Sequence, residues 1–504
     1  MINLTAAIVG QLVAVPIGFV ARLVFIRVLG AEYLGVNGLF TSILTMLSLV
    51  ELGIGPAIIF SLYKPLAEND TKKVQAIMQL YKKAYTIIGI VIVVLGAVMT
   101  PFLSYLFKDT PGINNLEIIY LLFVGNSAIS YFYAYKQNLI IADQRRYIVT
   151  IYRYAFFSIL NLLQIIFLYA TKNYIVFLIV QIACTLLQNL MAAKSADKLY
   201  PFLRQKTVEH LDGETVREIK KNTGAMVSHK IGDIVTNSTD NIVISAMVGT
   251  VWVGLYSNYV LITIALNGIM GQFFSAITAS IGNLGATSAK ERLLAVFRKV
   301  QFVTFWIFGF SSICLFYIFN PFIAVWIGKA YWLSMDTVLL LTVLFYVQGM
   351  RRAVLTFREA LGLYWYDRYN PLFQTVINIG VSVALAPKFG VSGVIVGTLV
   401  SLLTTCFLIE PYFLYKKGFA APFKLYYFRY AVYTAATALA GVITGKGVGL
   451  VTGETLSALI GKFLVCLTIP NIIFLLLFWR TKEFQYFFSL ANKFVLQKVM
   501  RKTG

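Results

Sequence analysis

The chain has 504 residues, of which 59% are hydrophobic and only 13% are charged, and its mean hydropathy is +0.77. A soluble domain carries about 25% charged residues, so this composition excludes an ordinary soluble globular protein, and its hydrophobicity excludes disorder. The 43 Lys and Arg residues against 21 Asp and Glu give a net charge of +22. Such basicity is typical of proteins that bind nucleic acid or anionic membranes, and the positions of the charges decide between the two.

Fourteen segments of the chain are apolar and long enough to cross a bilayer, which takes about 20 residues in a helix. In chain order they cover residues 4–29, 35–62, 84–107, 116–137, 147–171, 173–195, 223–249, 251–283, 300–320, 337–361, 370–388, 391–415, 427–445 and 456–480. A re-entrant course of a weaker segment such as 370–388 would reduce the count to twelve or thirteen. The sequence therefore predicts an all-α, polytopic membrane protein with about 14 transmembrane helices.

The basic residues fall mainly in every second connection between these segments. If the N-terminus lies in the cytoplasm, 32 of the 43 Lys and Arg residues lie in cytoplasmic loops and tails, six in outer loops and five inside segments. Because basic loops stay on the cytoplasmic side, this distribution predicts that both termini are cytoplasmic. Most of the net charge thus marks orientation, and no nucleic acid is expected as a partner.

Residue types that serve metal, nucleotide and covalent chemistry are scarce in the sequence. The four cysteines lie in apolar segments without paired spacing, which is typical of small buried hydrophobic residues. Two histidines cannot form a metal cluster, and no phosphate-binding loop of the G-x-x-x-x-G-K-[ST] type occurs. The outer loops are too short to hold a catalytic domain. The sequence therefore predicts no cofactor, no metal site and no enzyme active site.

A weak internal repeat relates the two halves of the chain. Residues 29–36 resemble residues 248–255 at an offset of 219, and Lys136 matches Arg358 at an offset of 222. These offsets pair the first and fourth segments with the seventh and tenth in the same orientation, which is typical of a parallel repeat about an axis along the membrane normal. We therefore expect two six-helix lobes around a central cavity, followed by two additional C-terminal helices.

The predicted domain boundaries follow from this repeat and from the charged connections. The N-lobe covers residues 1–195, a cytoplasmic linker 196–222, the C-lobe 223–415, the two additional helices 416–480, and the tail 481–504. Aromatic and basic residues alternate in the tail, which predicts an amphipathic helix on the inner membrane surface. A frayed tail is the alternative.

A single carboxylate, Glu51, lies within the second segment. A carboxyl group buried without a cation favours its neutral form, which suits a site that binds and releases protons. The alternative is a structural hydrogen bond to a neighbouring helix.

The seventh segment carries charged and polar residues on a single helical face. Four of them follow one another at spacings of 3, 4 and 3 residues: Lys230, Asp233, Asn237 and Asp240. A charge at the bilayer centre costs about 2.5–3.5 kcal/mol, so this face is expected to line a polar pathway, with His229 and Asn241 beside it. A Lys230–Asp233 pair that only locks the helix bundle is the alternative.

Arg22 and Asp240 lie at similar depths below the outer turns that the repeat relates. At 1.5 Å per residue, they are about 12 and about 14 Å from Gly30 and Gly249 along their helices. Opposite charges at matching depth in the two lobes predict an Arg22–Asp240 ion pair that closes the outer side in one state.

The tenth segment places two arginines, Arg351 and Arg352, in the middle of the membrane. Arg358 and Glu359 follow them by seven residues each, so two adjacent helix faces continue the charge inward. Snorkelling to the interface cannot explain a doublet at mid-segment. Because a guanidinium binds phosphate oxygens in a bidentate manner, the arginines predict a cationic cavity that binds an anion.

The predicted cavity therefore has three groups of residues. Its cations are Arg22, Lys136, Lys230, Arg351, Arg352 and Arg358. The acids expected to serve in coupling or gating are Glu51, Asp233, Asp240 and Glu359. The further polar lining is His229, Asn237 and Asn241.

Several stretches of sequence carry a family resemblance, in a fixed order along the chain. They are GAEYLGVNGLF (30–40), ELGIG (51–55), SLYKPL (61–66), YK (135–136) with ADQ (142–144), HKIG (229–232), DNIVIS (240–245) and GLYSNY (254–259). With these stretches the chain resembles the polysaccharide transporter family, the Wzx-like flippases for lipid-linked sugar repeat units. That family belongs to the larger group that includes multidrug/toxin extruders and lipid II flippases.

The resemblance implies a function at the bacterial cytoplasmic membrane. An undecaprenyl-pyrophosphate-linked oligosaccharide repeat unit would pass from the inner to the outer leaflet by alternating access through a cationic cavity, for capsule, exopolysaccharide or O-antigen-type synthesis. The expected partners are this glycolipid, membrane lipids, and glycosyltransferases and a polymerase of the same pathway. A proton or sodium gradient would drive the step, and the two additional helices would form a groove for the lipid tail.

Two other functions remain open at this point. The first is a multidrug or cation antiporter of the same superfamily, although such a protein is expected to keep an acidic cavity for cationic drugs. The second is an integral-membrane glycan polymerase or ligase, against which the short outer loops argue.

Overall fold

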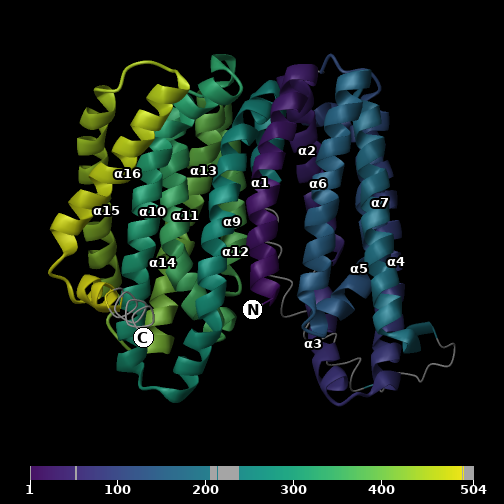
Figure 1. Ribbon diagram of the computed structural model, residues 1–504, viewed down its shortest axis with the longest axis horizontal. Helices are drawn as coiled ribbons and strands as arrows, with labels where there is room; N and C mark the ends of the chain where they lie inside the picture. The colour runs from purple at the N-terminus through teal and green to yellow at the C-terminus, as the bar shows by residue number, and fades with distance from the viewer. Residues whose placement is uncertain are drawn as a thin grey trace, which may run out of the picture. The chain divides into compact units, whose positions relative to one another are not determined.

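A computed structural model describes residues 2–51, 54–109, 111–204 and 238–490, together with positions 213 and 492. Within these residues the chain is helical and contains no strand (Figure 1). The helices up to residue 204 are α1 (Ile2–Leu29), α2 (Ala31–Leu47), α3 (Ile54–Ala67), α4 (Thr71–Met99), α5 (Leu116–Ala142), α6 (Arg146–Thr171) and α7 (Tyr174–Leu199). The later helices are α9 (Thr250–Thr287), α10 (Lys290–Trp326), α11 (Met335–Ala360), α12 (Asn370–Phe389), α13 (Val391–Thr404), α14 (Cys406–Phe413), α15 (Lys424–Gly449) and α16 (Leu456–Phe478).

Twelve helices in the described part of the chain are long and apolar enough to cross a membrane, which confirms an all-α polytopic membrane protein. Each coincides with one predicted segment, and the weak segment 370–388 is the continuous helix α12. Most of segment 223–249 lies outside the described residues. Segment 427–445 is α15, which is 26 residues long but is not among the twelve.

The chain folds into two compact units. The first contains Met1–Leu261 and Pro371–Gly397, and the second contains Ile262–Asn370 and Thr398–Gly504. These boundaries differ from those of the lobes expected at 1–195 and 223–415, which rest on the internal repeat and stay a prediction.

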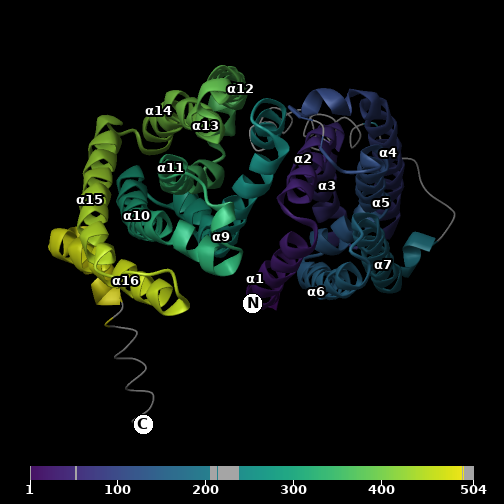
Figure 2. The same cartoon turned by 90° about the horizontal axis from the view of Figure 1, so that it is seen from above.

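The first unit is a bundle in which α5 lies between α4 and α7, and α1 packs against α6 (Figure 2). Its buried centre contains Tyr81 and Tyr85 of α4 together with Leu139 and Ile140 of α5. Capping defines where α4 begins, because the Asp70 side chain accepts a hydrogen bond from the backbone N–H of Lys73 in the first turn of this helix.

The second unit is organised around α10, which contacts α11, α15 and α16. Aromatic side chains fill the contact: Phe305 stacks on Tyr433 with ring centroids 4.4 Å apart and meets Phe474 of α16 at 4.8 Å. Such pairs add specific geometry to the large area that aromatic side chains bury. Helices α15 and α16 are therefore closely packed on α10 within this unit.

Helix α2 is interrupted at the site of Glu51. After Leu47 the backbone tightens into a 3₁₀ turn, Ser48–Glu51, and the next described helix, α3, begins at Ile54. Interrupted helices are tolerated at membrane depth where protein surrounds the freed backbone groups. Glu51 thus lies at a helix end.

The helical segment 391–415 is interrupted in the same manner. Thr405 leaves helical geometry (φ −114°, ψ −81°) between α13 and α14, and a π-helical turn, Leu414–Phe419, follows α14. Pro411 has no N–H for the carbonyl of Phe407, and the Tyr427 hydroxyl of α15 donates to that oxygen at 3.1 Å. The additional helix α15 therefore satisfies a backbone group that the proline leaves open.

The beginning of the tail forms a helix, residues 482–490, that packs on the second unit. Arg429 Nη1 lies 2.7 Å from Glu483 Oε1, Phe484 stacks on Trp306 at 5.9 Å, and Lys299 Nζ lies 3.4 Å from the ring centre of Tyr486. This part of the tail is bound to α10 and α15. Residues 493–504 lie outside the described residues, so the expected amphipathic helix on the membrane surface stays a prediction for them.

We expect Glu483→Gln to loosen the helix 482–490. The half-buried pair with Arg429 contributes about 1 kcal/mol, so amide hydrogen exchange of this helix should accelerate about fivefold at neutral pH. Lys482→Gln, in the same helix, is the matched control and should change exchange little.

The same pair predicts a pH dependence. Burial alone would raise the pKa of the Glu483 carboxyl, but the hydrogen bond and charge of Arg429 outweigh it and lower the pKa below its usual range. The stabilisation is therefore present above the usual glutamate pKa of about 4.3 and is lost as the pH falls through the lowered value. The amide hydrogen-exchange rates of helix 482–490 in wild type and in Glu483→Gln should become equal in that pH range. A difference between the two rates that stays constant down to pH 3 would contradict the role of the Arg429–Glu483 pair.

Candidate functional site

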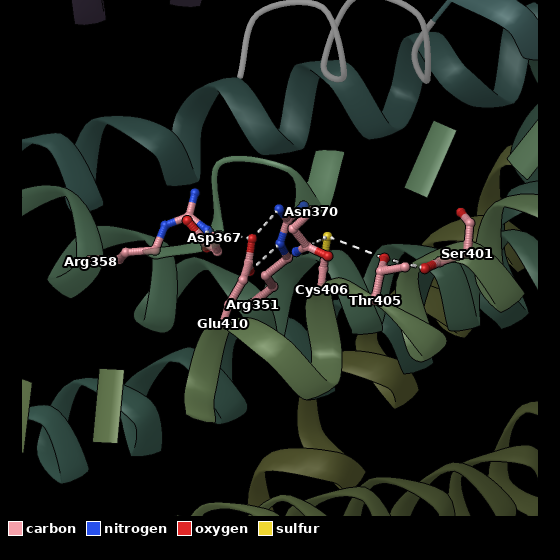
Figure 3. A network of polar contacts seen from close by, with 8 residues as sticks. All are labelled: Arg351, Arg358, Asp367, Asn370, Ser401, Thr405, Cys406 and Glu410. Atoms are coloured by element: carbon pink, nitrogen blue, oxygen red, sulfur yellow. Dashed lines mark hydrogen bonds and ion pairs between the residues drawn. The ribbon is translucent and has the colours of Figure 1, made fainter. Parts of the chain in front are cut away.

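The tenth predicted segment forms α11, and one of its faces carries a network of buried charges (Figure 3). Arg351 and Arg358 are seven residues apart and so lie two turns apart on the same face. Arg351 binds Glu410 of α14 through two nitrogens, Nε to Oε2 at 2.7 Å and Nη2 to Oε1 at 2.6 Å. Arg358 Nη1 donates to the same Oε1 at 2.7 Å and also to Asp367 Oδ2.

The network contains two cations and two acids and is electrically balanced. Arg351 retains 23% side-chain exposure, against 8% for Arg358, 1% for Glu410 and 0% for Asp367. Removing one partner from such a buried set would leave an uncompensated charge and cost about 3–5 kcal/mol. Two of the predicted cavity cations therefore already have carboxylate partners.

The local fold places Glu410 in reach of the arginines. It lies one turn beyond the interruption at Thr405, where Cys406 Sγ accepts a hydrogen bond from Asn370 Nδ2 at 3.6 Å. Asp367 comes from a short 3₁₀ turn, Leu363–Asp367, just after α11. Neither acid was among the predicted site residues. A signal for Glu410 was present, because it is the sole charge in the apolar segment 391–415.

The second arginine of the doublet faces the other way. Arg352 and Glu359 are exposed in α11, whereas Arg351 and Arg358 are largely covered. The structure thus divides these four charges between the two faces of α11 that their spacing predicts. Arg352 is the cation of this helix that is accessible at the surface of its unit.

Arg22 of α1 binds neutral partners in α9. Its Nε donates to Asn258 Oδ1 at 3.1 Å, and its Nη2 donates to Ser257 Oγ. Asp240 instead shares a hydrogen bond with Tyr256. The predicted Arg22–Asp240 pair is therefore not formed in this structure, because α9 offers Arg22 a hydroxyl and an amide.

A reciprocal close approach joins α2 and α9 beside Arg22. A Cβ on Gly35 would overlap the carbonyl oxygen of Thr250, and a Cβ on Gly254 would overlap that of Ala31. Residues 31 and 35 are related to 250 and 254 by the offset of 219 found in the sequence. The contact is thus symmetric under the internal repeat, and each helix needs its glycine for the other to approach.

Two further features extend this contact. Gly30 and Gly249, which directly precede the two related helices, have φ angles of +90° and +133°, which favour glycine. Asn241 Nδ2 donates to Ser42 Oγ of α2 at 2.9 Å. Asn241, a predicted cavity residue, therefore takes part in this contact.

Glu51 lies among tyrosines in the first unit. The Tyr85 hydroxyl donates to Glu51 Oε1, and Tyr131 also hydrogen-bonds to this carboxylate. Tyr81 donates to the carbonyl of Gly55 at 3.2 Å and accepts from Asn138 at 2.6 Å. No Lys or Arg in the described part of the chain pairs with Glu51.

The remaining predicted residues are placed elsewhere or are not described. Lys136 of α5 pairs with Asp197 of α7 at 2.7 Å, so it joins two helices of the first unit. His229, Lys230, Asp233 and Asn237 lie outside the described residues, and the predicted charged face of segment 223–249 stays a prediction.

Residues 2–281 match the model of the family described as polysaccharide biosynthesis protein. The match covers more than half of the 504 residues, and the chain belongs to this family. The family resemblance found in the sequence is thereby confirmed. The comparison with curated proteins finds no match.

Solved structures of several membrane transporters share the fold. Lipid II flippase MurJ in an inward closed conformation is similar with a TM-score of 0.65 and 14% identity, over 93% of this chain and 98% of that one. An inward-facing multidrug resistance MATE family transporter of the MOP superfamily gives a TM-score of 0.64 and 14% identity, over 81% of this chain and 97% of that one. A MOP superfamily transporter from Pyrococcus furiosus, described for the reverse polarity of its binding pocket, gives a TM-score of 0.53 and 14% identity. The similarity covers 81% of this chain and 94% of that one. The protein is thus a multi-pass membrane protein with a flippase and transporter fold.

We expect Gly35→Ala and Gly254→Ala each to prevent the close approach of α2 and α9. An added methyl group would meet a backbone oxygen, which cannot move aside as a side chain can. Cysteines introduced at Ser42 and Asn241 in a background without native cysteines should then cross-link at least tenfold less.

Gly125→Ala is the matched control for this measurement, since a Cβ at this membrane-helix position meets no atom within 4 Å. Unchanged cross-linking in the Gly35 and Gly254 variants would show that the glycines do not control the approach.

Proposed function

We propose that the protein translocates polyprenyl-pyrophosphate-linked oligosaccharides from the inner to the outer leaflet of a bacterial cytoplasmic membrane. The observation that carries the proposal is Arg22, a partly buried membrane cation whose described partners, Ser257 and Asn258, are neutral. A positive charge in the membrane whose partners in the described part of the chain are neutral is suited to bind an anion. A glycolipid pyrophosphate is the anion that fits a polysaccharide biosynthesis family.

The second unit also contains a cation suited to this anion, the accessible arginine of α11. Arg352 is exposed on a membrane helix, and a guanidinium binds pyrophosphate oxygens through two parallel hydrogen bonds. The apolar helices allow the prenyl tail to remain in lipid while the headgroup crosses. Lys230, if it lines the same pathway, would extend the series of cations.

Alternating access would use the contact between α2 and α9. With the N-terminus in the cytoplasm, Gly30 and Gly249 lie on the outer side, so this contact closes the outer end. Opening requires Arg22 to leave Ser257 and Asn258, which bind a guanidinium more weakly than a carboxylate does. A pyrophosphate that binds Arg22 would compete with these partners and shift the population toward the open contact.

An ion gradient would drive the cycle through Glu51. Tyr85 and Tyr131 can hydrogen-bond to either protonation state of the carboxyl, because a hydroxyl both donates and accepts. Binding and release of a proton at Glu51 would then couple the cycle to a proton gradient. Glycosyltransferases and a polymerase of the same pathway would act before and after translocation.

A multidrug or cation antiporter is the second candidate, and the surroundings of Glu51 favour it. A carboxylate surrounded by Tyr81, Tyr85 and Tyr131 is chemically suited to an organic cation, which gains both charge and cation–π attraction. The two functions differ in which charges bind the substrate, the arginines or Glu51.

We expect Arg22→Gln and Arg352→Gln each to reduce surface polysaccharide at least tenfold in a deletion strain that carries the variant gene. The loss of one charge-assisted contact to pyrophosphate corresponds to about 1.5–3 kcal/mol. Membrane levels of the protein should stay normal. Surface polysaccharide can be quantified by immunoblotting of whole cells.

Lys462→Gln is the control for these variants, because Lys462 is a basic residue of α16 whose Nζ donates to the carbonyl of Gly453 at 3.3 Å. Normal polysaccharide in both arginine variants, together with a loss of drug resistance in Glu51→Gln, would support the antiporter instead.

We further expect Glu51→Gln to abolish the response of transport to a proton gradient. The amide keeps the hydrogen bonds to the tyrosines but cannot titrate. In proteoliposomes that contain a fluorescent prenyl-pyrophosphate glycan, an imposed pH gradient should accelerate translocation by wild type and by Tyr85→Phe, but not by Glu51→Gln. Equal acceleration in Glu51→Gln would exclude this carboxyl as the coupling site.

A further inference from the structure

We propose that Glu410 is a positioning residue that binds Arg351 reversibly, so that this arginine exchanges between Glu410 and the pyrophosphate of the substrate. Arg358 keeps Glu410 paired while Arg351 is bound to the substrate. The inference rests on the proposed function and assigns a role to an acid that the sequence pattern did not single out.

The geometry of the Arg351–Glu410 pair allows a phosphate group to take the place of the carboxylate. Arg351 presents Nε and Nη2 to the two carboxylate oxygens at 2.7 and 2.6 Å. The same pair of nitrogens matches two oxygens of a phosphate group. One bidentate partner can therefore replace the other without loss of hydrogen bonds.

The exposed fractions of the four side chains indicate that Arg351 is the residue that moves. It is the member with a substantial exposed fraction, and Glu410 and Asp367 are almost completely covered. The cavity at Arg351, which Phe407, Tyr426 and Tyr430 also line, has a volume of about 10 Å³, which is room for about one water molecule. A pyrophosphate cannot enter this cavity, so the guanidinium must move outward to meet it.

Arg358 makes the departure of Arg351 tolerable. Its Nη1 donates to both Glu410 Oε1 and Asp367 Oδ2, so each buried carboxylate keeps a hydrogen-bonded cation when Arg351 leaves. In a simple buried pair the same movement would leave the acid with no partner, which is strongly unfavourable. The three-residue arrangement of Arg358 with two acids thus anchors the network, and Arg351 is its exchangeable member.

The exchange has a consequence for turnover. Glu410 competes with the substrate for Arg351 and so weakens binding of the headgroup, which helps the headgroup to leave at the outer leaflet. Removing the competing carboxylate should therefore tighten binding, whereas removing the guanidinium should weaken it. A purely structural role of Glu410 would predict no gain in affinity.

The test measures binding of farnesyl pyrophosphate, a soluble prenyl pyrophosphate, to the full-length protein in detergent micelles. We expect Glu410→Gln to bind at least fivefold more tightly than wild type and Arg351→Gln at least fivefold more weakly. The double variant Arg351→Gln/Glu410→Gln should bind as Arg351→Gln does, because Glu410 acts through Arg351. Thermal unfolding checks that each variant is folded.

The outcomes separate this inference from the proposed function. The proposed exchange is wrong if a folded Glu410→Gln variant binds the probe no more tightly than wild type. It is also wrong if Glu410→Gln strengthens binding by the same factor in the Arg351→Gln background. If wild type does not bind the probe, or Arg352→Gln leaves binding unchanged, the proposed pyrophosphate site fails instead. Should Glu410→Gln not fold, Glu410→Asp replaces it: at least twofold tighter binding supports the exchange, and unchanged binding overturns it.

Discussion

The constraint on which the rest of this structure depends is the cost of a charge in hydrocarbon. A charged side chain inside a membrane helix needs a partner within the protein, and the charges of this protein meet this need in different ways. In the second unit Arg351 and Arg358 are balanced by Glu410 and Asp367. In the first unit Arg22 binds a hydroxyl and an amide. Glu51 of the same unit binds tyrosine hydroxyls.

These two solutions have different functional consequences. Among the described residues the partners of Arg22 are neutral, so the anionic headgroup of the proposed substrate would change the local electrostatic balance directly. Carboxylate partners fix the arginines of α11 and make their release conditional on a competing anion. A transporter needs both properties, because its substrate must be attracted on one side of the membrane and released on the other.

Glu51 and Glu410 both lie close to a break in α-helical geometry. Glu51 ends the 3₁₀ turn after α2, and Glu410 follows the interruption at Thr405. An interruption frees backbone groups that lipid cannot satisfy, so neighbouring helices must approach and supply donors. Tyr427 of α15 does so for Phe407, which gives the additional C-terminal helices a structural role in this unit.

Much of this protein could be predicted from its amino-acid sequence. Hydrophobic segments and the distribution of Lys and Arg predict the membrane helices, because insertion energy is a sum over local residues. The spacing of seven between Arg351 and Arg358 predicts a common face of α11, and the offset of 219 relates the glycines that meet between α2 and α9. What only the tertiary structure decided is the partner of each charge. Arg351 meets Glu410 across 59 residues and Arg22 meets Asn258 across 236, and the choice depends on which helix faces adjoin. Local sequence determines which groups need a partner in the membrane, whereas the packing of distant helices determines which partner each one finds.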